Sequence, residues 1–307
     1  MIRSKSATAT LSVVSNCVLI AMKVAAGAIT GSIAIITEAV HSSIDLVASI
    51  VALVSVRRAD APPDEDHPYG HEKVENLAAT IEGMLILVGA GIVVYEATRR
   101  LATGAEVEQL GVGIAVIALS IVVNLAVSAF IGRRARELHS AALEGDAAHL
   151  NADAVTSLGV LGGLILVEAT GVVAFDAIAA LVVAVAIVAS GVRIMRRSGG
   201  VLVDEAPPPQ ELDAIEAAIA RAGIPEVAGY HKLRARRAGA RRWVDLHVQF
   251  RDGTTLERAH EAAHELRDAI RAALGGGADV LIHVEPETSV REMPDSPLRW
   301  SDSGPAR

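Results

Sequence analysis

A histidine followed four residues later by an aspartate occurs twice in this chain, each time inside an apolar stretch. The two pairs are His41 with Asp45 and His149 with Asp153. Residues four apart lie on one face of a helix, so each pair directs an imidazole and a carboxylate the same way. Ionisable side chains at membrane depth are costly and mark ion pathways or relays. Two facing pairs therefore predict a tetrahedral transport site for a divalent metal, zinc above all. The alternative is a buried polar network that locks helices together.

These ligand types also predict a mechanism. Metal binding requires neutral imidazoles and ionised carboxylates, so metal displaces protons and protons displace metal. The unperturbed pKa of histidine, about 6.5, places this exchange where modest pH differences matter. If the site opens alternately to the two sides, protons that run inward drive metal outward. We therefore expect a secondary active transporter, not an enzyme, that exchanges cytoplasmic Zn²⁺ for protons.

The composition places both pairs in a membrane protein. Of the 307 residues, 51% are hydrophobic, and a span needs about 20 mainly apolar residues. Six stretches qualify, residues 8–29, 32–56, 77–98, 109–132, 142–168 and 172–195. With these bounds the second His-Asp pair lies about one turn nearer the cytoplasm than the first, a mismatch that a fifth helix starting before Ala142, or tilted, would resolve. Cationic residues gather on one side of the spans, so both termini are predicted to be cytoplasmic. The expected membrane is a prokaryotic inner or plasma membrane, and its lipids are partners of the chain.

Charge and cysteine content exclude other classes. The formal net charge of −8 argues against a nucleic-acid partner. The single cysteine, Cys17, lies in the first apolar run, so neither a disulfide framework nor a CxxC metal site is expected. No organic cofactor is expected either. The first apolar run lacks a small-residue cleavage site and is interpreted as a retained span.

The chain is predicted to contain two domains and a tail. Residues 1–200 form an all-α transmembrane domain of six helices, and glycine and proline residues near 199–209 mark its end. Residues 210–290 predict the order α-β-β-α-β, which favours a small cytoplasmic α+β domain of the ferredoxin-like type. Residues 291–307 are polar, rich in Ser and Pro, and predicted to be disordered.

Several segments resemble motifs of one known family, the cation diffusion facilitators. Residues 32–45 (SIAIITEAVHSSID) resemble its second-helix signature, and residues 64–75 (DEDHPYGHEKVE) resemble the cytoplasmic loop that follows. Residues 149–153 match the fifth-helix motif, and residues 283–286 (HVEP) fit the end of the soluble domain. These motifs occur in the family's order over residues 1–290.

The resemblance implies a homodimeric exporter of divalent cations with a cytoplasmic metal-binding domain, often coupled to protons. The His-Asp/His-Asp set is similar to the zinc-transporting branch. Where other members carry Asp at the first of these positions, this chain has His41. Exchange of a carboxylate for an imidazole should favour zinc over cadmium. Cadmium, cobalt, iron and manganese remain alternative substrates.

Further candidate ligands lie outside the spans. Asp64, His67 and His71 predict an open metal site in the loop, against the alternative of a solvated acidic turn. In the soluble domain, the resemblance implies a regulatory zinc site, against the alternative of ordinary surface histidines. Its candidate ligands are His231, His247, His260, His283 and Glu285. Lys73 and Asp204 are predicted to form a charge pair where the two domains join.

Two alternatives come from other functional classes. His260, Glu261 and His264 satisfy the H-E-x-x-H pattern of zinc proteases, on a predicted helix. Under this alternative the chain is a membrane-anchored zinc protease. Against it, Glu and Ala are common in amphipathic helices, so the pattern can arise by chance, and no third metal ligand is evident. A metal sensor that binds zinc without transporting it is the second alternative.

Overall fold

The computed structural model describes residues 4–30, 33–103, 111–170, 172 and 174–287. The predicted disordered tail, residues 291–307, lies outside the described residues. So do several side chains of the second helix, among them that of His41, whose backbone alone is described. The chain divides into two compact units, Met1–Leu202 and Val203–Arg307.

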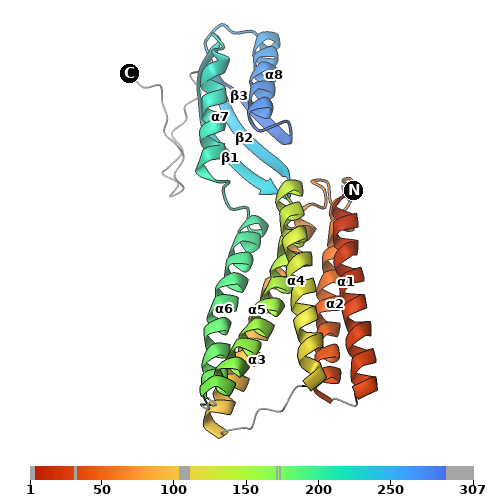
Figure 1. The fold of residues 1–307 in the computed structure, drawn as a ribbon. Helices are drawn as coiled ribbons and strands as arrows, with labels where there is room; N and C mark the ends of the chain where they lie inside the picture. Colours follow the sequence, from red (N-terminus) through yellow and green to blue (C-terminus); the bar gives the residue numbers. More distant parts are fainter. Residues whose placement is uncertain (1–3, 31–32, 104–110, 171, 173, 288–307) are drawn as a thin grey trace. The chain divides into compact units, whose positions relative to one another are not determined.

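The first unit is a bundle of six helices that run side by side (Figure 1). They are α1 (Lys5–Thr30), α2 (Ile33–Ala59), α3 (Lys73–Thr103), α4 (Gly111–Leu138), α5 (Ala141–Thr170) and α6 (Ala174–Leu202). Among the described residues, five of these helices are long and apolar enough to cross a membrane, namely α1, α3, α4, α5 and α6. The remaining predicted span, residues 32–56, lies on α2, where several side chains are outside the described residues.

The bundle is apolar on the outside and polar within. Val18, Ile92 and Val185 are 61%, 62% and 71% exposed, whereas Ser12, Asn16 and many alanines are buried. Small residues at helix contacts and polar side chains facing the interior are typical of membrane bundles. Helices α3 and α6 pack closely, and a Cβ at Gly83 would lie 2.7 Å from Met195 Cγ. The first unit is therefore built to place polar groups on its axis and apolar groups against lipid.

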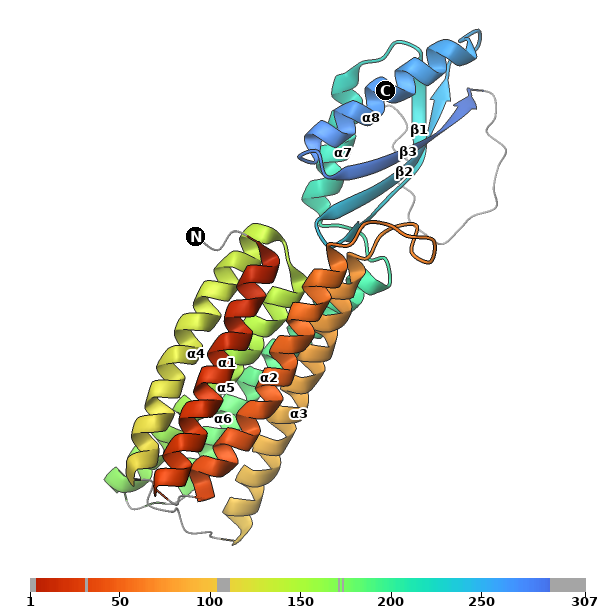
Figure 2. The ribbon, with the colours of Figure 1, turned by 90° about the vertical axis from the view of Figure 1, so that its right-hand side faces the viewer.

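The second unit has two helices on one face of a three-stranded sheet. Its elements are α7 (Pro209–Ala222), β1 (Val227–Ala238), β2 (Arg241–Phe250), α8 (Leu256–Ala273) and β3 (Ala278–Pro286). The sheet order is β1-β2-β3, with β1 antiparallel and β3 parallel to β2 (Figure 2). The predicted order α-β-β-α-β is confirmed, and the ferredoxin-like assignment stays a prediction.

Apolar and polar side chains alternate along β2, which determines the face of the sheet on which its polar side chains lie. Val244, Leu246, Val248 and Phe250 are buried against α7 and α8. Successive side chains of a strand point to opposite faces, so His247 lies on the face away from the helices. Thr255 caps the start of α8 by accepting a hydrogen bond from the backbone N–H of Arg258. Helices α7 and α8 thus cover one face of the sheet, and the polar side chains of β2 lie on the other face.

Candidate metal centres

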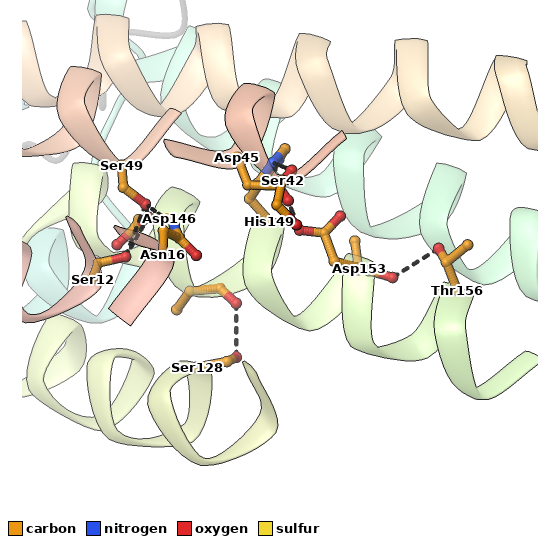
Figure 3. A network of polar contacts seen from close by, with 12 residues as sticks. Ser12, Asn16, Ser42, Asp45, Ser49, Ser128, Asp146, His149, Asp153 and Thr156 are labelled. Carbon is orange, nitrogen blue, oxygen red and sulfur yellow. Dashed lines mark hydrogen bonds and ion pairs between the residues drawn. The ribbon is translucent and has the colours of Figure 1, made fainter. Parts of the chain in front are cut away.

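The first centre lies inside the bundle, between α2 and α5. Asp45, His149 and Asp153 bring one ligand atom each to within 4.8 Å of one another. His149 Nε2 lies 3.2 Å from Asp45 Oδ1 and 3.9 Å from Asp153 Oδ2 (Figure 3). Asp45 and His149 are buried. The i, i+4 spacing on α5 brings His149 and Asp153 onto one face, and α2 supplies the facing carboxylate.

His41, the fourth predicted ligand, precedes Asp45 by four residues on α2, so the helical backbone places both on one face. The neighbouring Ser42 is buried and accepts a hydrogen bond of 2.8 Å from Lys23 Nζ of α1. The two nitrogens and two carboxylates expected here remain a prediction, because the side chain of His41 is outside the described residues.

A polar network that the sequence interpretation missed adjoins this centre. Asp146 lies three residues before His149 on α5 and is fully buried. Its Oδ1 accepts hydrogen bonds from Ser12 Oγ at 3.0 Å and Ser49 Oγ at 2.8 Å, and Asn16 Nδ2 donates to Ser49 Oγ at 2.8 Å (Figure 3). The sequence signal that could have revealed it is an acidic residue, Asp146, three positions before His149 on the same helix.

The second centre lies in the loop between α2 and α3. Asp64 Oδ1 is 3.1 Å from His67 Nδ1, and Asp64 Oδ2 is 3.1 Å from His71 Nε2. Desolvation raises the pKa of the Asp64 carboxyl, but hydrogen bonds from the backbone and ring of His67 and the charge of His71 outweigh it. The pKa is therefore below its ordinary value. Asp64 and His67 are exposed while His71 is buried, so this donor set is open on one side.

The third centre runs across the free face of the second unit's sheet. His231 pairs in register with His247, and His247 with His283, so three histidines stand side by side on three strands. Glu285 joins them, with Oε2 2.9 Å from His231 Nε2 and Oε1 2.5 Å from His247 Nδ1. His283 Nε2 lies 3.6 Å from the same Oε1. Desolvation opposes ionisation of Glu285, but the hydrogen bonds of His247 and His231 hold its pKa below the ordinary value.

His260 does not belong to this cluster within one chain. It is on α8, which packs against the other face of the sheet, and its ring centroid lies 4.4 Å from that of His264. Glu261, between them in sequence, lies 3.5 Å from Arg258. Of the metal-ligating groups found among the described residues, none includes this H-E-x-x-H segment. The protease alternative therefore gains no third ligand.

The charge pair of Lys73 with Asp204 stays a prediction, because the two residues belong to different units. Within the second unit, Arg236 Nη1 donates to both carboxylate oxygens of Asp204, at 3.0 and 3.1 Å. Within the first, Lys73 Nζ donates to the carbonyl of Leu202 at 3.4 Å. Each partner is therefore engaged inside its own unit.

Comparison with known proteins assigns the class. A family model described as the cation efflux transmembrane domain matches residues 9–203, and the cytoplasmic domain of cation efflux proteins matches residues 207–287. The uncharacterized transporter sll1263 of Synechocystis is 31% identical over 281 residues, which cover 91% of this chain and 89% of the relative. The cation-efflux pump FieF of Pectobacterium atrosepticum is 32% identical over 275 residues, 90% of each chain.

A solved structure, the metal-bound C-terminal domain of the CzcD transporter from Thermotoga maritima, is 28% identical with a TM-score of 0.25. It covers 26% of this chain and 92% of that one.

The chain therefore belongs to the cation diffusion facilitator family, as its motifs predicted. It is an integral membrane protein and a transporter for the efflux of divalent cations, a class that contains transporters and not enzymes. Its second unit corresponds to the family's cytoplasmic dimerisation domain.

Proposed function

We propose that this protein exports Zn²⁺ from the cytoplasm in exchange for protons, through His41, Asp45, His149 and Asp153. The observation that carries the proposal is the buried triad of Asp45, His149 and Asp153, whose ligand atoms lie within 4.8 Å of one another. An imidazole and two carboxylates at this spacing need only one more ligand for the tetrahedral geometry that zinc prefers. His41, on the Asp45 face of α2, supplies it.

The contacts of His149 support the proposed proton exchange. His149 Nε2 lies 3.2 Å from Asp45 Oδ1 and 3.9 Å from Asp153 Oδ2, so a proton on this nitrogen would hydrogen-bond to Asp45 and be attracted by both carboxylates. A zinc ion at this position takes the same lone pairs, so its arrival expels the proton and a returning proton expels the ion. Alternating access then couples outward metal movement to inward proton movement.

The proposed architecture is a homodimer in which each chain spans the membrane six times with both termini in the cytoplasm. The clustering of cationic residues supports this orientation, and a prokaryotic inner or plasma membrane is the expected location. Homodimerisation is supported by the match to the cytoplasmic domain. The charge pair of Lys73 with Asp204 would fasten the membrane domain to this domain.

The two outer centres are proposed as regulatory zinc sites. In the loop, Asp64, His67 and His71 offer a partly hydrated site. In the cytoplasmic domain, His231, His247 and Glu285 offer two nitrogens and an oxygen, a donor set that fits zinc. Glu285 stands where many family members have Asp, and its carboxylate still reaches both histidines. Bound zinc would supply a cross-link between the strands, so occupancy would report cytoplasmic zinc.

Transport in proteoliposomes with an imposed pH gradient tests this function. Wild-type protein should take up zinc when the proton gradient runs in the opposite direction, out of the vesicles. Asp153→Asn should abolish this uptake. Asp252→Asn, in the exposed turn between β2 and α8, is the matched control and should behave as wild type. Unchanged uptake by Asp153→Asn would refute the transport site. Zinc binding without flux in the wild type would favour the sensor alternative, and preference for cadmium or manganese would refute the zinc assignment.

A further inference from the structure

Two buried carboxylates inside the bundle have no role in the transport site described above. Asp146 on α5 and Glu82 on α3 are both 0% exposed. Gly145 directly precedes Asp146 in the chain, and a Cβ at Gly145 would overlap the Glu82 carboxylate. The Glu82 carboxylate therefore occupies the space where Gly145 has no side chain. The absence of a side chain at Gly145 is what allows α3 to bring a second acid to this place.

The polar groups around these acids satisfy only one of their four oxygens. Ser12 and Ser49 both donate to Asp146 Oδ1. Asp146 Oδ2 and both oxygens of Glu82 are buried without a hydrogen-bond partner. In the part of the chain that the structure describes, His149 is the basic group that acts on Asp146, and Asp146 is the charged group that acts on Glu82. Buried carboxylates in this condition require a proton or a bound cation.

Their location connects the acids to the transport path. Asp146 lies one helical turn before His149, on the side of α5 nearer its first residue, Ala141. In the proposed orientation this is the cytoplasmic side. An ion that enters from the cytoplasm thus reaches Asp146 and Glu82 before it reaches Asp45, His149 and Asp153.

We propose that Glu82 and Asp146 form a second binding station, which receives the divalent cation from the cytoplasm and passes it to the transport site. Two carboxylates balance the ion's charge, and the three unpartnered oxygens are its ligands. The station lacks nitrogen ligands, so it holds zinc less tightly than the transport site with its imidazoles. An ion path needs binding that is favourable enough for entry and weak enough for onward movement. The station rests on the proposed export function.

Zinc uptake by everted membrane vesicles, whose cytoplasmic face is outside, tests the station. Glu82→Gln keeps the shape of the side chain and removes its charge. It should raise the half-saturating zinc concentration at least about tenfold, as loss of a metal-site group does, while the rate at saturating zinc stays within about twofold of wild type. Asp146→Asn should do the same, because its amide oxygen still accepts from Ser12 and Ser49.

Glu96→Gln is the matched control, since Glu96 lies on α3 beside Arg99 and is 42% exposed. It should leave half-saturation unchanged. Wild-type half-saturation in both Glu82→Gln and Asp146→Asn would overturn the station. So would loss of transport at every zinc concentration in correctly folded variants, because that result assigns the acids to the transport step itself. Failure of the wild type to transport zinc would instead refute the proposed export function.

Discussion

The transport centre and the cytoplasmic centre use the same ligand chemistry in opposite settings. In the bundle, His149 lies between two carboxylates, buried, on helices that place ligands four residues apart. On the sheet, Glu285 lies among three histidines that are partly or largely exposed, with ligands from three strands. In the function proposed here, the carboxylate-rich buried site would exchange its metal with protons, and the histidine-rich surface site would respond to the concentration of metal in the solvent. The same ligand types, placed in a buried helical setting or on an exposed sheet, thus suit two different proposed roles, transport and regulation.

The largest effect that tests this comparison is loss of the imidazole in the bundle. His149→Gln removes the nitrogen that Asp45 and Asp153 share. Loss of an outer-shell partner alone costs about 10–100-fold in metal affinity, so zinc flux should fall at least about 100-fold. Zinc binding by the cytoplasmic domain should persist. Flux near the wild-type value would show that the buried cluster is only a structural network.

The corresponding change on the sheet should affect stability and not the maximal rate. A ligand at 100 times its Kd stabilises a fold by about 2.7 kcal/mol. Zinc should therefore raise the melting temperature of the wild-type cytoplasmic domain, measured in the full chain by tryptophan fluorescence. His247→Ala should remove this shift and keep the flux at saturating zinc. Abolished flux in this variant would contradict the division between the two centres.

Acid should weaken the sheet cluster through Glu285. Its pKa is lowered in the folded state, so its contribution is fully present above the unfolded value of about 4.3. The contribution is lost as the pH falls from that value through the folded pKa. Urea unfolding of the metal-free protein between pH 7 and 3 should show this loss, and Glu285→Gln should flatten the curve. A curve of equal slope in the variant would assign the acid sensitivity to other groups.

The loop centre should give the smallest effect. His67 and Asp64 are exposed, with side chains 54% and 43% accessible, and exposed ion pairs contribute about 0–1 kcal/mol. His67→Ala should therefore change zinc flux by less than about fivefold. Initial rates over a zinc titration measure this. A loss as large as that of His149→Gln would place the loop on the obligatory path of the ion.

Features that depend on residues close together in the sequence were easier to predict than features that depend on contacts between distant segments. The His-Asp spacings are local, so the sequence alone suggested the bundle site, and the order of helices and strands in the second unit was also correctly predicted. The span bounds left the two pairs offset by one turn unless the fifth helix began before Ala142; α5 begins at Ala141, and His149 Nε2 lies 3.2 Å from Asp45 Oδ1. Span limits drawn from hydropathy alone cannot fix the depth at which two helices face each other.

Other features depend on packing that no single segment encodes. The register of β1, β2 and β3 aligns three histidines that are far apart in sequence, and the same sheet leaves His260 on the opposite side. Glu82 meets Gly145 only because α3 packs closely on α5. The sequence marks such groups as buried acids, and the fold decides which of them meet.

The coupling of metal and proton at one buried site is tested most directly by recording zinc uptake and lumenal pH together in the same proteoliposomes. The account predicts that each entry of zinc is matched by proton exit and that both signals disappear in His149→Gln and in Asp45→Asn. Zinc uptake without a proton signal in the wild type, or a proton signal that survives in these variants, would contradict it.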